Sequence, residues 1–315
     1  MNWEYESPRK AYGQTLVELG HEREDIVVLD ADLSTSTKTA MFGKEFPDRF
    51  FNVGLQEQNM MGIAAGLARS GKMVFASSFA VFATGRAYDQ VRQSIAYPRL
   101  NVKIVATHGG VTVGEDGASH QMIEDIGLMC GLPNMRVIVP VDSNEVRRVI
   151  RYVASQYGPF YVRLTRTALP NLTSKDDEFI FGKGTVMRDG SDATIIATGI
   201  EVSYSLLAAE LLKKEGYDIR VINMSTVKPV DKDIIVKAAR ETGAIMTVED
   251  HNIYNGLGSR VGEALVENYP VPMRRHGMQD VFGRSGKWNM LLEYYEMDDK
   301  GIAKKMLSFL KEVKK

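Results

Sequence analysis

The sequence has a single cysteine, Cys130, and no uninterrupted apolar run long enough to cross a membrane as a helix. One cysteine excludes a disulfide within the chain and is typical of a reducing compartment, so we expect a cytoplasmic protein. Cys130 lies in the apolar run 126–130, where we expect it to pack as a small hydrophobic side chain. The N-terminus lacks the basic segment and following apolar segment of a signal peptide.

An excess of charge of one sign is also absent, since the formal net charge is -1. A nearly neutral chain without a basic, aromatic-bearing stripe has no electrostatic reason to bind nucleic acid or a membrane surface. No Gly-x-x-x-x-Gly-Lys-Ser/Thr phosphate loop occurs, and the glycines at 256, 258 and 262 miss the spacing of a dinucleotide-binding fingerprint. We therefore expect no nucleic-acid partner, no membrane partner and no nucleotide-dependent chemistry.

Strand-like and helix-like segments alternate along the first half of the chain. The 315 residues, 44% hydrophobic and 25% charged, suffice for two globular domains. Alternation of strands and helices is typical of a parallel sheet covered on both faces. We predict strands at 26–29, 49–53, 73–76, 102–106, 135–139 and 160–164, and helices at 9–19, from 57, 84–97, from 123 and 144–156.

Regular patterning lapses between 165 and 192, where proline, glycine and polar residues suggest an interdomain connection with a short edge hairpin at 179–186. A second alternating unit follows. Its strands are predicted at 193–197, 218–223, 244–248 and 272–275, and its helices at 201–215, 231–240, 258–266 and 298–314. We predict an α/β fold with two three-layer α/β/α domains, 1–170 and 192–315, joined by a linker at 171–191.

The stretch Phe51 to Met60 places the carboxylate of Glu57 at the start of an otherwise apolar helix. An acidic residue in a first helical turn complements the helix dipole, so a purely electrostatic role is one interpretation. The other is chemical, because burial raises the pKa of a carboxylate and suits it to exchange a proton with a ring nitrogen.

Three further motifs follow in order, at 77–82, 106–110 and 114–121. Together with the stretch around Glu57 they resemble the C-terminal half of transketolase, and the resemblance runs from Arg9 to the C-terminus. It implies a parallel-sheet pyrimidine-binding domain followed by a smaller transketolase C-terminal-like domain with a mixed sheet. It also implies thiamine diphosphate as the cofactor.

The resemblance gives Glu57 a catalytic role, in which it hydrogen-bonds a ring nitrogen of the cofactor and takes part in the proton transfer that activates it. Phe79 and Phe82 are expected to line the pocket for the pyrimidine ring. Gly85 stands where the family often has a third aromatic residue. Asp32 matches an acid near the thiazolium ring.

His108, Asp116 and His120 match the spacing of family residues that contact the sugar. The resemblance implies that Asp116 meets the hydroxyl next to the ketose carbonyl, while both histidines bind sugar oxygens and shuttle protons. A metal site built from these three residues is the competing interpretation, which their spacing disfavours. Arg9, Ser36 and Arg166 fall where family residues bind the substrate phosphate.

The family motif for the cofactor's diphosphate, Gly-Asp-Gly followed by an asparagine, is absent from the sequence. Its function is to hold Mg²⁺ or Ca²⁺ through hard oxygen ligands. We therefore expect a C-terminal subunit of a split transketolase, active only with an N-terminal transketolase subunit that supplies the diphosphate-binding domain and the metal. An α2β2 complex is expected, because family active sites form between subunits. The implied reaction is two-carbon ketol transfer between ketose and aldose phosphates in the pentose phosphate pathway.

Several alternatives stay open. A 1-deoxyxylulose-5-phosphate synthase half has a His-His pair where this chain has His120 and Gln121, and a 2-oxo acid dehydrogenase E1 beta subunit lacks the run seen at 114–121. A split transketolase could act on another sugar, such as a branched pentulose phosphate. A non-catalytic assembly subunit could keep the fold, although it would not need Glu57 or the residues of the sugar site.

Overall fold

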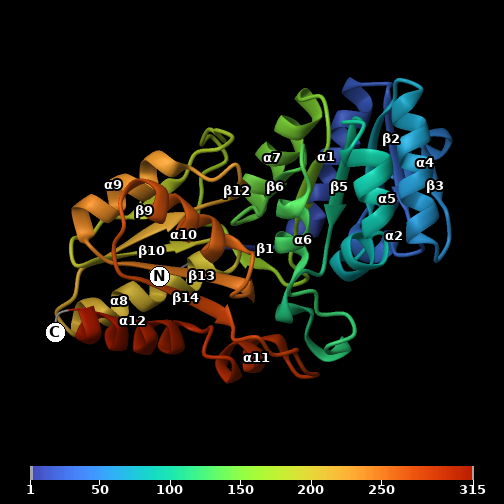
Figure 1. The fold of residues 1–315 in the computed structure, drawn as a ribbon. Coiled ribbons are helices and arrows are strands. Elements are labelled where there is room, and N and C mark those ends of the chain that lie inside the picture. The colour runs from blue at the N-terminus through green and yellow to red at the C-terminus, as the bar shows by residue number, and fades with distance from the viewer. Residues whose placement is uncertain (1–2, 314–315) are drawn as a thin grey trace. The chain divides into compact units, whose positions relative to one another are not determined.

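The structure is a computed structural model that describes residues 3–313. The described chain forms two compact units (Figure 1). The first contains the described residues up to Gly109 together with Leu128–Phe179, and the second contains Gly110–Gly127 together with the described residues from Ile180 onward. The limits 1–170, 171–191 and 192–315 remain a prediction. The sequence did not predict that the segment 110–127 groups with the second unit.

The first unit is built on a parallel sheet whose strands run in the order β6-β7-β5-β4-β2-β3. All residues of β2, β4, β5 and β7 are buried, which fits a parallel sheet covered on both faces. The strands are β2 (Ile26–Asp30), β3 (Phe50–Asn52), β4 (Met73–Ser77), β5 (Val102–Ala106), β6 (Arg136–Ile138) and β7 (Phe160–Arg163). Short strands β1 (Tyr5–Glu6) and β8 (Leu169–Pro170) pair antiparallel.

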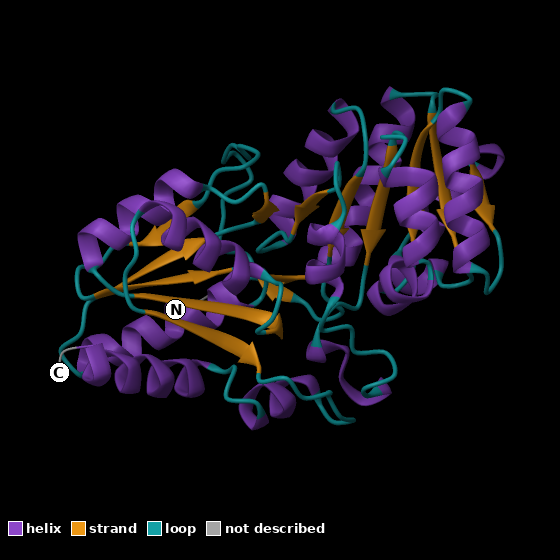
Figure 2. Ribbon diagram, in the orientation of Figure 1, coloured by secondary structure: helices purple, strands orange, loops and turns teal. Residues whose placement is uncertain are grey.

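Two groups of helices accompany this sheet (Figure 2). In one group, α1 (Pro8–Glu22) packs against α3 (Ala40–Glu45) and α7 (Ser143–Ser155). In the other group, α4 (Glu57–Arg69) packs against β4 and α5 (Tyr88–Gln90). The helix predicted at 84–97 is present, but it is divided: two π-helical segments, Val81–Arg86 and Val91–Ala96, flank the short α5. Shorter helices are α2 (Ser34–Thr37), η1 (Pro47–Arg49) and α6 (Asp125–Gly131). Wider π turns occur frequently at functional sites.

The second unit has a mixed sheet in the order β14-β13-β10-β11-β9. Strands β10 (Ala193–Ala197), β11 (Ile219–Asn223), β13 (Ile245–Asn252) and β14 (Met273–Met278) are parallel, and β9 (Thr185–Arg188) joins β11 antiparallel. The edge hairpin predicted at 179–186 is therefore wrong, because β9 pairs with a strand distant in sequence. The three-layer fold and the mixed sheet are confirmed.

Helices α8 (Glu201–Lys214) and α12 (Asp299–Val313) pack together on one face of this sheet, and α9 (Lys232–Thr242) and α10 (Leu257–Asn268) on the other (Figure 1). The remaining elements are α11 (Trp288–Tyr294), β12 (Thr226–Lys228) and the 3-10 helix η4 (Val111–Asp116). Within residues 3–313, no helix has both the length and the apolar character required to cross a bilayer.

His276 on β14 is a buried titratable group in the second unit. Its Nε2 donates to the carbonyl of Glu296 at 2.7 Å, and the side chain is buried. Burial lowers the pKa of His276, and the bond to the carbonyl only partly offsets that effect. The folded chain therefore resists a proton that the unfolded chain accepts below about pH 6.5.

We predict that the free energy of unfolding falls as the pH drops from 7.5 to 5.5, and that His276→Gln makes this fall smaller. Below the unfolded pKa the unfolded state binds more protons, so acid favours unfolding by up to about 1.4 kcal/mol per pH unit for this group. Urea unfolding at both pH values measures the difference. The matched control is His21→Gln, since the His21 side chain is 59% exposed. If the free energy of unfolding falls equally in the two variants between pH 7.5 and 5.5, the prediction is contradicted.

Candidate functional site

Glu57 is the first residue of α4, and its side chain is 1% exposed. Its Oε2 accepts a hydrogen bond from Nη1 of Arg86 at 2.9 Å. Its Oε1 is buried and has no hydrogen-bond partner among the described residues. Because an unsatisfied buried carboxylate oxygen is costly, this atom is poised to accept a hydrogen bond from a ligand.

Ring contacts lead from Arg86 to His108. The guanidinium carbon of Arg86 lies 4.4 Å from the ring centroid of Phe82. The rings of Phe82 and Phe79 are nearly parallel, with centroids 6.0 Å apart, and Phe79 stacks on the imidazole of His108 at 3.6 Å. Glu57, Phe79, Phe82 and His108 are therefore brought together within the first unit.

Arg86 has no role predicted from the sequence. It ends the π-helical segment Val81–Arg86 and joins Glu57 to the aromatic group. The only signal in the sequence is the pair Gly85 and Arg86, at the place where a third aromatic residue is expected. A guanidinium over the face of Phe82 supplies a cation–π contact there instead of a third ring.

Arg9 and Arg166 form a second group in the first unit. Nη1 of Arg9 donates to the backbone carbonyl of Ser36 at 2.8 Å, and its Nε is buried without a hydrogen-bond partner in the described part of the chain. Burial lowers the pKa of Arg9, and the positive charge of Arg166 lowers it further. An anion bound by both guanidinium groups would offset this repulsion and accept the remaining N–H.

Asp30, at the end of β2, shapes the loop 31–39, which contains the short helix α2 with Ser36. Its carboxylate accepts hydrogen bonds from the backbone N–H of Leu33 at 2.6 Å and from the hydroxyls of Thr37 and Thr39 at 2.7 and 2.8 Å. Burial raises the pKa of Asp30, while these bonds favour its charged form. A buried carboxylate therefore sets the conformation of this loop.

Asp32 lies two residues farther on, with a positive φ of 63°. It pairs with Asn52: the Asp32 N–H donates to Oδ1 of Asn52 at 3.0 Å, and Oδ1 of Asp32 accepts from Nδ2 of Asn52 at 3.2 Å. The side chain is exposed at the carboxyl edge of the sheet, where ligands of parallel α/β sheets bind.

Asp116 and His120 lie on the segment 110–127, which belongs to the second unit. Positive φ angles at Gly110, Gly114 and Gly117 let this segment turn sharply. The Asp116 side chain is exposed and that of His120 is half-buried, with Nδ1 3.0 Å from the hydroxyl oxygen of Ser119. Both side chains are accessible to a ligand.

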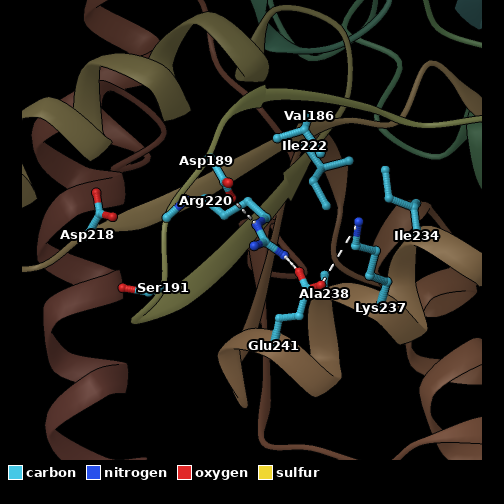
Figure 3. A pocket seen from close by; sticks show the side chains of 11 residues that line it. Val186, Asp189, Ser191, Asp218, Arg220, Ile222, Ile234, Lys237, Ala238 and Glu241 are labelled. Atoms are coloured by element: carbon cyan, nitrogen blue, oxygen red, sulfur yellow. Dashed lines mark hydrogen bonds and ion pairs between the residues drawn. The ribbon is translucent and has the colours of Figure 1, made fainter.

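A hollow of about 690 Å³ opens beside β9, β11 and α9 in the second unit (Figure 3). Its charged groups are already paired: Arg220 pairs with Asp189 and Glu241, Lys237 lies 4.0 Å from Glu241, and Asp218 pairs with Arg188 outside the lining. None of the predicted site residues lines it, and its paired charges leave no evident ligand contact. The lining residues are Val186, Asp189, Gly190, Ser191, Asp218, Arg220, Ile222, Ile234, Lys237, Ala238 and Glu241.

The group around Glu57 fits the pyrimidine end of thiamine diphosphate. A carboxylate oxygen without a donor matches a protonated ring nitrogen, and the faces of Phe79 and Phe82 match a flat ring. Within residues 3–313, no three His, Cys, Asp or Glu side chains cluster as a metal ion would require.

Two family models match the chain. The model for the transketolase pyrimidine-binding domain covers residues 6–171, and the model for the transketolase C-terminal domain covers residues 182–302. A protein of Methanocaldococcus jannaschii described as a transketolase C-terminal section is 53% identical over 98% of both chains. A subunit of 6-deoxy-6-sulfo-D-fructose transketolase from a Clostridium species is 42% identical over 94% of this chain and 92% of its own length.

The comparisons of structure agree with those of sequence. A solved chain described as a split gene transketolase in an inactive β4 tetramer has a TM-score of 0.88 and 48% identity, covering 98% of this chain and 97% of that chain. The transketolase of Campylobacter jejuni shares the fold, with a TM-score of 0.83 and 22% identity, and this chain covers 47% of it. Human transketolase is 38% identical, and this chain covers 48% of its length. The chain therefore belongs to the thiamine diphosphate-dependent transketolase family, and within it to the C-terminal subunits of split transketolases.

Proposed function

We propose that this chain is the pyrimidine-binding subunit of an active split transketolase that transfers a two-carbon ketol unit between ketose and aldose phosphates. The observation that carries the proposal is the buried Oε1 of Glu57, which lacks a hydrogen-bond partner among residues 3–313 and lies in the group that contains Phe79 and Phe82. When bound, thiamine diphosphate supplies the nucleophilic carbon of this chemistry. Glu57 holds and moves a proton at the pyrimidine nitrogen.

The remaining site residues bind the substrate. His108 and His120 bind the sugar oxygens and exchange protons with them, while Asp116 accepts a hydrogen bond from the hydroxyl next to the carbonyl. Arg9 and Arg166, together with Ser36, bind the phosphate. The repulsion between the two arginines and the open Nε of Arg9 support this assignment.

The partner is an N-terminal transketolase subunit that holds the diphosphate through Mg²⁺ or Ca²⁺, and the two chains assemble as α2β2. The missing Gly-Asp-Gly motif supports a metal site outside this sequence. The description of the similar solved chain as inactive is compatible with a subunit that works only in a complex.

A second candidate is the same reaction on a different sugar. Relatives at 42% and 40% identity are named as subunits of 6-deoxy-6-sulfo-D-fructose transketolase and apulose-4-phosphate transketolase. The donor of this protein could therefore be a sulfo-sugar or a branched sugar phosphate rather than a linear pentulose phosphate.

The test is to mix the chain with its candidate partner, thiamine diphosphate and Mg²⁺, and to assay two-carbon transfer from xylulose 5-phosphate to ribose 5-phosphate. Sulfofructose and apulose 4-phosphate serve as competing donors in the same assay. We expect transfer only when both subunits are present. Turnover by this chain alone would contradict the split-site proposal.

We predict that Glu57→Ala lowers kcat of the reconstituted complex at least about 100-fold, because positioned proton transfer contributes that much or more. Steady-state kinetics measures the loss. The control is Glu145→Gln, which changes a buried glutamate in the first turn of α7 that accepts from the Val141 N–H at 2.6 Å. An assembly subunit would instead keep full activity after Glu57→Ala.

Arg86→Met should lower the free energy of unfolding by about 1 to 3 kcal/mol, because it leaves the buried Glu57 carboxylate without its donor. In a Glu57→Gln background the same change should cost less, since no buried charge remains. Urea unfolding of the four chains gives this double-mutant cycle. Equal costs in both backgrounds would show that the Arg86 contact with Glu57 does not stabilise the fold.

Arg9→Gln should raise KM for phosphorylated ketose donors about 10- to 100-fold, since a charge-assisted bond to phosphate contributes about 1.5 to 3 kcal/mol. KM for the matching unphosphorylated ketose should not change. Arg69→Gln removes an exposed arginine at the end of α4 and serves as the control. A parallel rise in KM for both donors would remove Arg9 from the phosphate site.

A further inference from the structure

We propose that Asp250 of the second unit is a positioning residue for the sugar site, because it fixes the segment that carries Asp116 and His120. The inference rests on the proposed function, since it assigns those two side chains to the substrate. On this proposal, the second unit takes part in substrate binding. Asp250 itself is not placed in contact with substrate or cofactor.

The carboxylate of Asp250 holds the start of the segment. Asp250 lies on β13 and is 2% exposed. Its Oδ1 accepts from the backbone N–H of Val111 at 2.9 Å, and its Oδ2 from the hydroxyl of Thr112 at 3.3 Å. A Cβ atom at Gly110 would overlap this carboxylate, and the φ of Gly110 is +83°. Only glycine is compatible with this close approach.

The same strand also holds the end of the segment. The N–H of Asn252 donates to the carbonyl of Ile123 at 2.7 Å, and the N–H of Gly127 donates to Nε2 of His251 at 3.3 Å. Nδ1 of His251 lies 2.7 Å from the carbonyl of Asn252. Both bonds are satisfied when the imidazole is neutral with its proton on Nδ1.

The side chain of Gln121 connects the end of the segment to its start. Nε2 of Gln121 lies 3.3 and 3.1 Å from the carbonyl oxygens of Val111 and Gly114, and 2.9 Å from that of Arg284. The N–H of Gly110 also donates to the carbonyl of Met122 at 2.7 Å. The base of the loop is therefore fixed from both sides, while Asp116 and His120 lie on its accessible part.

Fixing the base matters because a displacement of about 1 Å at a binding group can reduce a rate on the order of 100-fold. An amide N–H that loses its acceptor also opens more readily to solvent. Loss of the Asp250 carboxylate should therefore have two separate effects: local opening of the segment and weaker binding of the ketose. The first can be measured without any assay of activity.

Hydrogen–deuterium exchange on the full chain tests the local effect. We expect Asp250→Ala to speed exchange in peptides that span 110–123 at least about tenfold, with a smaller effect for Asp250→Asn. The control is Asp231→Ala, which removes another buried carboxylate of the same unit, one that accepts from the backbone N–H groups of Asp233 and Ile234. Unchanged exchange in 110–123 for both Asp250 variants would overturn the proposal.

Kinetics of the reconstituted complex tests the functional effect. Asp250→Ala should raise KM for the ketose donor about tenfold or more while the affinity for thiamine diphosphate stays the same. In a background that lacks both side chains, Asp116→Ala with His120→Ala, the added rise should be less than about twofold, because both residues that Asp250 positions are already missing. Fully additive effects would show that Asp250 does not act through these two side chains.

The outcomes separate this inference from the proposed function. If Asp250→Ala speeds exchange in 110–123 but the complex shows no ketol transfer, the result would support the role of Asp250 in fixing the segment and overturn the proposed function. An active complex whose donor KM is insensitive to His120→Ala would refute the sugar-site assignment on which the inference rests. An active complex with normal KM and normal exchange in Asp250→Asn and Asp250→Ala would refute the inference alone.

Discussion

The first unit is organised around the Glu57 carboxylate, for which the described residues supply a hydrogen bond to only one of the two oxygens. Glu57 is almost fully buried, and Arg86 satisfies one oxygen while the other has no partner among the described residues. A buried acceptor of this kind is stable only if other interactions keep it in place, here the ion pair and the cation–π contact of Arg86 with Phe82. Within residues 3–313, Glu57 therefore keeps one buried acceptor oxygen without a donor.

The segment 110–127 links sequence order and architecture in an unexpected way. It precedes the predicted linker, yet its contacts are with β13 and with the chain around Arg284. Asp250 and Asn252 supply those contacts from a strand more than one hundred residues later. The second unit therefore orders this segment through tertiary contacts that sequence order does not suggest.

Local patterns in the sequence predict most of the regular elements, because apolar periodicity and helix starts such as Glu57 depend on nearby residues. They fail where distant residues decide the structure. The strand β9 pairs with β11, and no local turn signal could distinguish this pairing from a hairpin. Periodicity also could not predict the π turns of Val81–Arg86. The site residues come from family motifs, and Arg86 and Asp250 lie outside the quoted motifs because only tertiary contacts give them a role.

Buried aspartate carboxylates near the ends of parallel strands have the same role at three places. Asp30 at the end of β2, Asp142 beyond β6 and Asp250 on β13 each place a buried carboxylate where it accepts hydrogen bonds from backbone N–H groups of another segment. Parallel strands end at one edge of a sheet, and the loops at that edge carry ligands, so these loops must be ordered without a core of their own. A carboxylate does this well because it accepts several bonds at once and each charge-assisted bond is strong. The segments that carry Ser36, Asp116 and His120 are thus ordered by buried carboxylates, while these three side chains stay at least partly exposed.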